Sequence, residues 1–124
     1  MSKRDIAILT DVALITCVVQ RGVAEKIITV AYEAGAQGAT VNFAKGMGIR
    51  ERLGILGVAV EVEKEVIHIV VSSDQVERIF EKIYLAGDLD TPGMGIMYIT
   101  PLEKAATYIP PEVLEKLAAP VAGG

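Results

Sequence analysis

Two glycine clusters, Gly46–Gly48 and Gly93–Gly95, are the residues best suited to bind an anion. Each consists of two glycines around a methionine and lies beside a predicted strand. Backbone N–H groups without a neighbouring side chain can approach a phosphate closely. Most Gly-x-Gly sequences are ordinary turns, so one cluster alone is weak evidence. Two clusters at matching ends of a repeated unit strengthen the case for a binding site.

The only histidine, His68, lies between Ile67 and Ile69 in an apolar run. It could contact a ligand, or three copies could meet around a metal ion at an axis. A hydrogen-bonded histidine in a mostly buried sheet is the commoner case. Because no second ligand lies nearby, we predict no metal site. Lys64 follows Glu61 and is equally well explained as a solvated charge.

Side chains for nucleophilic or acid–base catalysis are scarce. The chain has one histidine and one cysteine, and it shows neither a Ser-His-Asp set, a Cys-His dyad nor a CxxC motif. No carboxylate pair stands out either. We therefore predict that the protein is not an enzyme. Cys17, among Ile15, Val18 and Val19, is predicted to be a buried small hydrophobe, and a single cysteine cannot form an intrachain disulfide.

The length of 124 residues fits one domain. We expect a core at 12–109, the span of the family resemblance given below, with an N-terminal extension at 1–11 and a C-terminal helix and tail at 110–124. A hydrophobic content of 52% is high for this size and indicates contact with partner subunits. The net charge of −4 argues against non-specific nucleic-acid binding. The sequence shows no secretory signal and no membrane-spanning run, so we expect a cytoplasmic protein.

An internal repeat determines the predicted fold. Residues 15–35 match residues 67–87 at a constant offset, and each copy runs from an apolar strand into an amphipathic helix that stops at Ala-Gly. The identical pairs are Ile15/Ile67, Val18/Val70, Val19/Val71, Glu25/Glu77, Ile27/Ile79, Tyr32/Tyr84, Ala34/Ala86 and Gly35/Gly87.

Two strand–helix–strand units in series predict an α+β fold of the ferredoxin-like βαββαβ type. We expect two helices on one face of a four-stranded antiparallel sheet, and Asp74 with Glu77 as a capping box for the second helix. Pro110 and Pro111 are predicted to open a short C-terminal helix. The expected strands are 12–19, 40–44, 66–71 and 95–99, and the expected helices begin at Val23 and Asp74.

The strand at 66–71 is apolar on both faces. Because an antiparallel sheet can leave one face in water, two apolar faces indicate that oligomerisation buries the second.

The segment 46–58 forms a glycine-rich loop between the second and third strands, and its apolar residues have no evident role in a core. One interpretation is a surface that binds a partner protein. The alternative is a longer hairpin that packs on neighbouring subunits. The candidate partner-binding residues are Ile49, Leu53, Ile55 and Leu56.

Three segments resemble the P-II nitrogen-regulatory signalling proteins. Ala39–Gly48 resembles the entry to their long T-loop, Val66–Val71 their third strand, and Gln75–Ile99 their second helix, B-loop and last strand. The resemblance covers about residues 12–109. It implies a homotrimer with nucleotide pockets between subunits that regulates a target protein, in this family often a membrane transporter.

The resemblance also implies a set of ligand-binding residues. Thr40 and Val70 match the adenine side of the family pocket, and Lys64 matches a lysine that helps to bind 2-oxoglutarate or a phosphate. His68 stands where the family usually has glutamate, and Arg50 where it has the T-loop glutamine. The matching glycines of the T-loop base and the B-loop are Gly46, Gly48, Gly93 and Gly95.

The phosphate side departs from the family pattern. Ile96 replaces the B-loop lysine, Thr107 and Ile109 align with the C-loop arginines, and the loop is short and lacks a tyrosine. Each charge-assisted hydrogen bond to phosphate contributes roughly 1.5–3 kcal/mol. Losing three cations would cost about 5 kcal/mol, more than a thousandfold in affinity. No cofactor is firmly implied; if an adenine nucleotide is the effector, we expect AMP, ADP or cyclic AMP rather than ATP, and we expect no conventional 2-oxoglutarate sensing.

Two further interpretations remain open from the sequence. The first is a trimeric metal-binding protein similar to CutA proteins, which share the architecture, with His68 and Cys17 or methionines as ligands. The second is a structural trimer that has lost its ligand.

Overall fold

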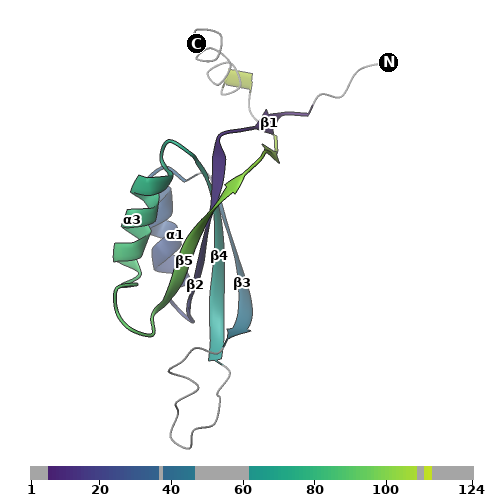
Figure 1. Ribbon diagram of the computed structural model, residues 1–124. Helices are drawn as coiled ribbons and strands as arrows, with labels where there is room; N and C mark the ends of the chain where they lie inside the picture. Colours follow the sequence, from purple (N-terminus) through teal and green to yellow (C-terminus); the bar gives the residue numbers. More distant parts are fainter. Residues whose placement is uncertain (1–5, 37, 47–61, 109–110, 113–124) are drawn as a thin grey trace, which may run out of the picture.

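The computed structural model describes residues 6–36, 38–46, 62–108 and 111–112. Four strands form an antiparallel sheet in the order β3-β4-β2-β5, and helices α1 and α3 cover one of its faces (Figure 1). This confirms the predicted ferredoxin-like α+β fold. The elements are β2 Val12–Gln20, α1 Ala24–Glu33, β3 Ala39–Gly46, β4 Val62–Ser72, α3 Val76–Ala86 and β5 Gly95–Leu102.

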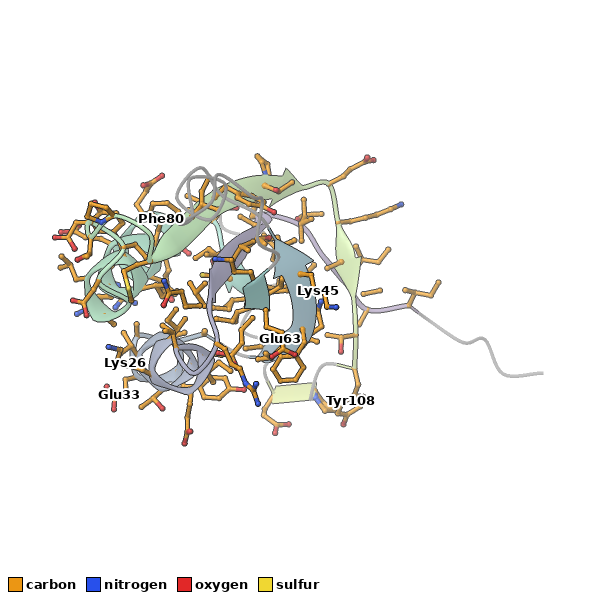
Figure 2. All side chains as sticks on the ribbon, turned by 90° about the horizontal axis from the view of Figure 1, so that it is seen from below. Lys26, Glu33, Lys45, Glu63, Phe80 and Tyr108 are labelled. Atoms are coloured by element: carbon orange, nitrogen blue, oxygen red, sulfur yellow. The ribbon has the colours of Figure 1, made fainter. Side chains whose placement is uncertain are left out.

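The core lies between the two helices and the sheet, and Figure 2 shows side chains filling this space. Odd-numbered residues of the strands point into it because successive strand residues alternate between faces. The repeat places equivalent residues alike, since Ile27 and Ile79 are both fully buried on their helices. The largest fully buried side chains are Ile15, Ile27, Ile67, Ile69, Ile79, Ile83, Val19 and Cys17.

Helix α1 is capped by a side chain from the sheet. Its own N-cap residue, Val23, makes no side-chain hydrogen bond. The carboxylate of Glu65 on β4 instead accepts hydrogen bonds from the backbone N–H groups of Gly22 (2.7 Å) and Ala24 (3.0 Å). A carboxylate here satisfies free N–H groups and interacts favourably with the helix dipole. Glu65 therefore joins the start of α1 to the central part of the sheet.

The other end of α1 is held by α3. Ala34 is the C-cap residue and Gly35 has φ +113°, so the helix stops where the Ala-Gly pair predicts. The guanidinium of Arg78 donates to the carbonyl oxygen of Ala34 at 2.6 Å. A cation at a helix C-terminus satisfies a free carbonyl and complements the dipole.

The predicted capping box at Asp74 and Glu77 is wrong. Helix α3 begins at Val76 with Gln75 as the N-cap residue, and no side chain caps it. Asp74 lies one residue too early, in the turn, where its carboxylate accepts a hydrogen bond from the Ser72 hydroxyl. The Asp74 carboxylate, which the capping-box motif predicted would cap the helix, is thus hydrogen-bonded within the turn instead.

Two further differences concern strand lengths and the chain ends. Strand β4 is longer than the predicted 66–71, because its charged first half pairs with β3. The N-terminal extension forms β1, Ile8–Leu9, which pairs with β6, Ala105–Ala106. Of the predicted C-terminal helix, Pro111 and Glu112 are helical, and the rest lies outside the described residues. In the part of the chain that is described, no helix is long and apolar enough to span a membrane.

We predict that Glu65→Ala lowers the free energy of unfolding by about 1–2 kcal/mol, because two backbone N–H groups lose their acceptor. Glu63→Ala is the matched control, since its ion pair with Arg21 is exposed and should contribute less than about 1 kcal/mol. Urea unfolding at one protein concentration, followed by circular dichroism, measures both. Equal losses in the two variants would contradict the capping role.

Candidate functional site

The sheet face opposite the helices, here called the open face, carries the even-numbered residues of all four strands. Neither α1 nor α3 covers it. Val18 and Val66 are half-buried there, and Val70 and Ile96 are 37% and 60% exposed. The sheet therefore has two largely apolar faces, and the two helices bury only one of them.

One rung of the open face is polar across all four strands. Thr40 of β3 pairs with His68 of β4, His68 with Thr16 of β2, and Thr16 with Tyr98 of β5. Directly opposed side chains have Cβ atoms about 4.5–5.5 Å apart, so these four groups form a polar row. Thr16 is only 2% exposed, His68 is half-buried, and Thr40 and Tyr98 are open. The row can exchange hydrogen bonds with whatever covers this face.

The other two predicted ligand residues of β4 share this face with His68. Val70 is its neighbour on the same side of the strand. Lys64 lies four residues before His68, about 13 Å along the strand, and is half-buried. The structure therefore brings Thr40, His68 and Val70 together and places Lys64 further down the sheet.

Lys64 lies at the end of the sheet where β3 ends and β4 begins, here called the loop end (Figure 1). Three of the four predicted glycines, Gly46, Gly93 and Gly95, also lie at this end. Gly46 is the last residue of β3, and Gly95 is the first of β5. Gln20, opposite Lys64, donates from Nε2 to the carbonyl oxygen of Gly93 at 2.7 Å. The last residue of β2 thus holds the turn between α3 and β5.

The second glycine cluster has a structural reason for its composition. Gly93 has φ +84° and Gly95 has φ +144°, conformations that favour glycine. A Cβ at Gly95 would overlap the carbonyl oxygen of Val18 and lie 3.0 Å from the Cα of Val19. The close approach of β5 to β2 therefore requires glycine at this position whether or not an anion binds.

The two glycine segments lie at the same end of the sheet but on opposite edges. Gly46 belongs to β3 and Gly95 to β5, and β4 and β2 separate them. Three inter-strand steps of about 4.8 Å place these edges about 14 Å apart. A single phosphate group cannot contact both Gly46 and Gly95 of one copy. A site that uses both would need β3 of one copy beside β5 of another.

Charged side chains surround the loop end. Arg21 Nη1 lies 2.9 Å from Glu63 Oε2, in an ion pair that is 74% and 51% exposed. Lys45 lies opposite Glu63 in the β3–β4 ladder, and Figure 2 shows both side chains at this end. The Arg21–Glu63 pair links the turn after β2 to the start of β4, the strand that follows the 47–61 segment.

Cys17 and His68 lie on opposite faces of the sheet. Cys17 pairs with Ile67 and points into the core, whereas His68 points to the open face. Burial raises the pKa of the Cys17 thiol to about 12. These two residues cannot bind the same metal ion, which removes Cys17 from the ligands of the CutA-like interpretation. Among the described residues, no three His, Cys, Asp or Glu side chains cluster in a way that could hold a metal.

Several predicted site residues lie outside the described residues, and their assignments stay predictions: Gly48, Ile49, Arg50, Leu53, Ile55, Leu56 and Ile109.

Sequence reasoning did not identify Thr16, Gln20, Glu65 or Tyr98. Thr16 and Tyr98 join the polar row only through strand register, which no local pattern reports. Gln20 gave a weak signal as the first polar residue after the apolar run of β2. Glu65 was hidden in a charged segment that is equally typical of a solvated strand.

The family model described as "Nitrogen regulatory protein P-II" matches residues 12–110. A crystal structure of Arabidopsis thaliana PII bound to citrate is similar, with a TM-score of 0.61 and 21% identity, over 76% of this chain and 79% of the Arabidopsis chain. A search of proteins with curated functions finds no significant sequence match.

We predict that Gly95→Ala lowers the free energy of unfolding by about 2–4 kcal/mol, because the methyl group meets the backbone of β2 in a strained conformation. Gly22→Ala is the matched control: its φ is +95°, yet no atom lies within 4 Å of an added Cβ. It should cost about 1 kcal/mol. Urea unfolding separates the two, and a control loss as large as that of Gly95→Ala would refute the steric explanation.

We also predict that Cys17 of the folded protein reacts slowly with Ellman's reagent at pH 8. A pKa of about 12 leaves roughly one thiol in ten thousand ionised, and the side chain is fully buried. Complete reaction within minutes after addition of denaturing urea is the control. Equally fast reaction in the folded protein would contradict the core position of Cys17.

Proposed function

The chain belongs to the nitrogen regulatory protein P-II family, and from this premise we propose that it is a signal-transducing homotrimer. It binds a small effector in clefts between subunits and controls a target protein through the loop at residues 46–58. Proteins of this family are trimeric regulators of target proteins rather than enzymes.

The position of the two glycine segments is the observation that supports this proposal most directly. Gly46 and Gly95 lie at one end of the sheet on opposite edge strands, too far apart to share a phosphate within one copy. A cleft between β3 of one copy and β5 of the next would unite them. Such a cleft would adjoin the 46–58 loop, so an effector bound there could order the loop.

The polar row supplies the second part of the proposed site. Thr40 and His68 offer hydrogen-bond donors and acceptors beside the apolar side chain of Val70. A purine base combines a flat apolar surface with polar edges, which suits this mixture. Ile96 and Thr107 are exposed without charge at the positions of family cations. We therefore propose AMP, ADP or cyclic AMP as the effector, in preference to ATP.

The target is a protein, and a membrane transporter is the kind of target that family membership favours. Nitrogen regulation is the pathway that the family name suggests, and we propose it on that ground alone. A cytoplasmic location follows from the same proposal.

We predict that isothermal titration detects micromolar binding of AMP, ADP or cyclic AMP and weaker binding of ATP, with and without Mg²⁺ and 2-oxoglutarate. Citrate belongs in the panel because the Arabidopsis protein binds it. His68→Ala combined with Thr40→Val should weaken nucleotide binding at least tenfold. Thr29→Val, on the exposed side of α1, is the control and should bind as the wild type does. If none of these compounds gives a measurable heat of binding, a structural trimer without a nucleotide ligand would be favoured.

We further predict that deletion of Leu53 to Leu56 abolishes capture of the target protein and leaves the trimer intact. The loop lies between strands whose pairing is complete without it, so the fold should tolerate the deletion. Affinity capture from the native cell extract, followed by mass spectrometry, compares the deletion with the wild type, and sedimentation velocity checks assembly. Retained capture would exclude the loop as the target-binding surface.

A further inference from the structure

The N-terminal extension builds a two-stranded arm from residues 6–9 and 105–108. Ile8 pairs with Ala106 and Leu9 with Ala105, which continues the register in which Val12 pairs with Leu102. The arm is therefore an extension of the β2–β5 ladder beyond the end of the sheet. Figures 1 and 2 both show it on the side away from the helices.

A kink separates the arm from the sheet. Asp11 has φ +51°, and its carbonyl oxygen accepts a hydrogen bond from the Ser73 N–H at 2.8 Å. Strand β4 ends at Ser72, and among the described residues no third strand pairs with the arm. The kink is thus anchored to the sheet, whereas the described strands beyond it pair with each other.

One face of the arm is apolar and uncovered. Ile6 is 73% exposed, Ile8 is 48% exposed and Tyr108 is 80% exposed. Ala106, opposite Ile8, is also exposed, and the same register would place Tyr108 opposite Ile6. The arm lies on the side of the molecule away from the helices, as the open face does, and the exposed Lys104 lies between the two along the chain.

We propose that this arm clasps a second copy of the chain, which covers Ile6, Ile8 and Tyr108 together with the open face. The inference rests on the proposed homotrimer and adds the N-terminal segment to its interface. A two-stranded ribbon of this length is at best marginally stable in water, so a lasting contact must hold it. An apolar face without charges is typical of permanent subunit interfaces rather than of transient ones.

Photo-crosslinking tests the contact directly. Ile8→Cys, labelled with a benzophenone maleimide, should give covalent dimers on illumination. Leu85→Cys is the matched control because it is 60% exposed on α3, away from the arm, and should give none. The buried Cys17 thiol should stay unlabelled in the folded protein.

Sedimentation equilibrium provides the second readout. Ile8→Asp and a variant that begins at Thr10 should raise the concentration at which the oligomer dissociates at least tenfold, and Leu85→Asp should not. Circular dichroism checks that each variant is folded. The clasp is overturned if the wild type is oligomeric, Ile8→Cys gives no crosslinks, and the arm variants dissociate at the same concentration as the wild type. That result would not contradict the proposed trimer. A wild type that is monomeric at every concentration overturns both the clasp and the proposed homotrimer. Crosslinks that form only to an added target protein, and never between copies of the chain, overturn the clasp.

Discussion

The complete pairing of strand β2 on both of its edges is the constraint on which the rest of the structure depends. From Val12 to Gln20 it pairs with β4, and from Val12 to Val19 it pairs with β5. Each residue from Val12 to Val19 therefore has a fixed neighbour on either side and a fixed face. Gly95 shows how tight this pairing is, since β5 approaches β2 too closely for any side chain there. The same ladder, continued past Asp11, positions the arm.

The alternation of side chains along β2 and β4 gives the sheet two apolar surfaces, of which the helices bury only one. The odd-numbered residues are buried by helices that arise from the same repeat, whereas the even-numbered residues form the open face. A small domain cannot bury both faces with two helices, because the helices lie on one side only. This is the physical reason for expecting further copies of the chain to complete the structure. The polar row, with Thr16 already buried, would then lie inside the assembly.

Contacts at the loop end connect segments that are far apart in the sequence. Glu65 joins β4 to the start of α1, and Arg21 joins the turn between β2 and α1 to Glu63. Gln20 joins β2 to the turn at Gly93. Glu63 and Glu65 belong to β4, the strand that follows the 47–61 segment. In the proposed function, a ligand that shifts one of these turns would also shift the start of β4, which would link the effector to the target.

The sequence by itself determined the architecture, because a strand–helix repeat with a period of two in the strands and an amphipathic pattern in the helices has few ways to bury its apolar residues. It also identified Thr40, His68, Val70 and the two glycine clusters as candidates. Only the tertiary structure decided which of these meet, because strand register sets the partners across the sheet and is not encoded in any local pattern. Register placed His68 and Cys17 on opposite faces, added Thr16 and Tyr98 to the polar row, and made Glu65 the cap of α1. It also paired residues 8–9 with 105–106, since a contact between opposite ends of a chain depends on where the fold brings those ends.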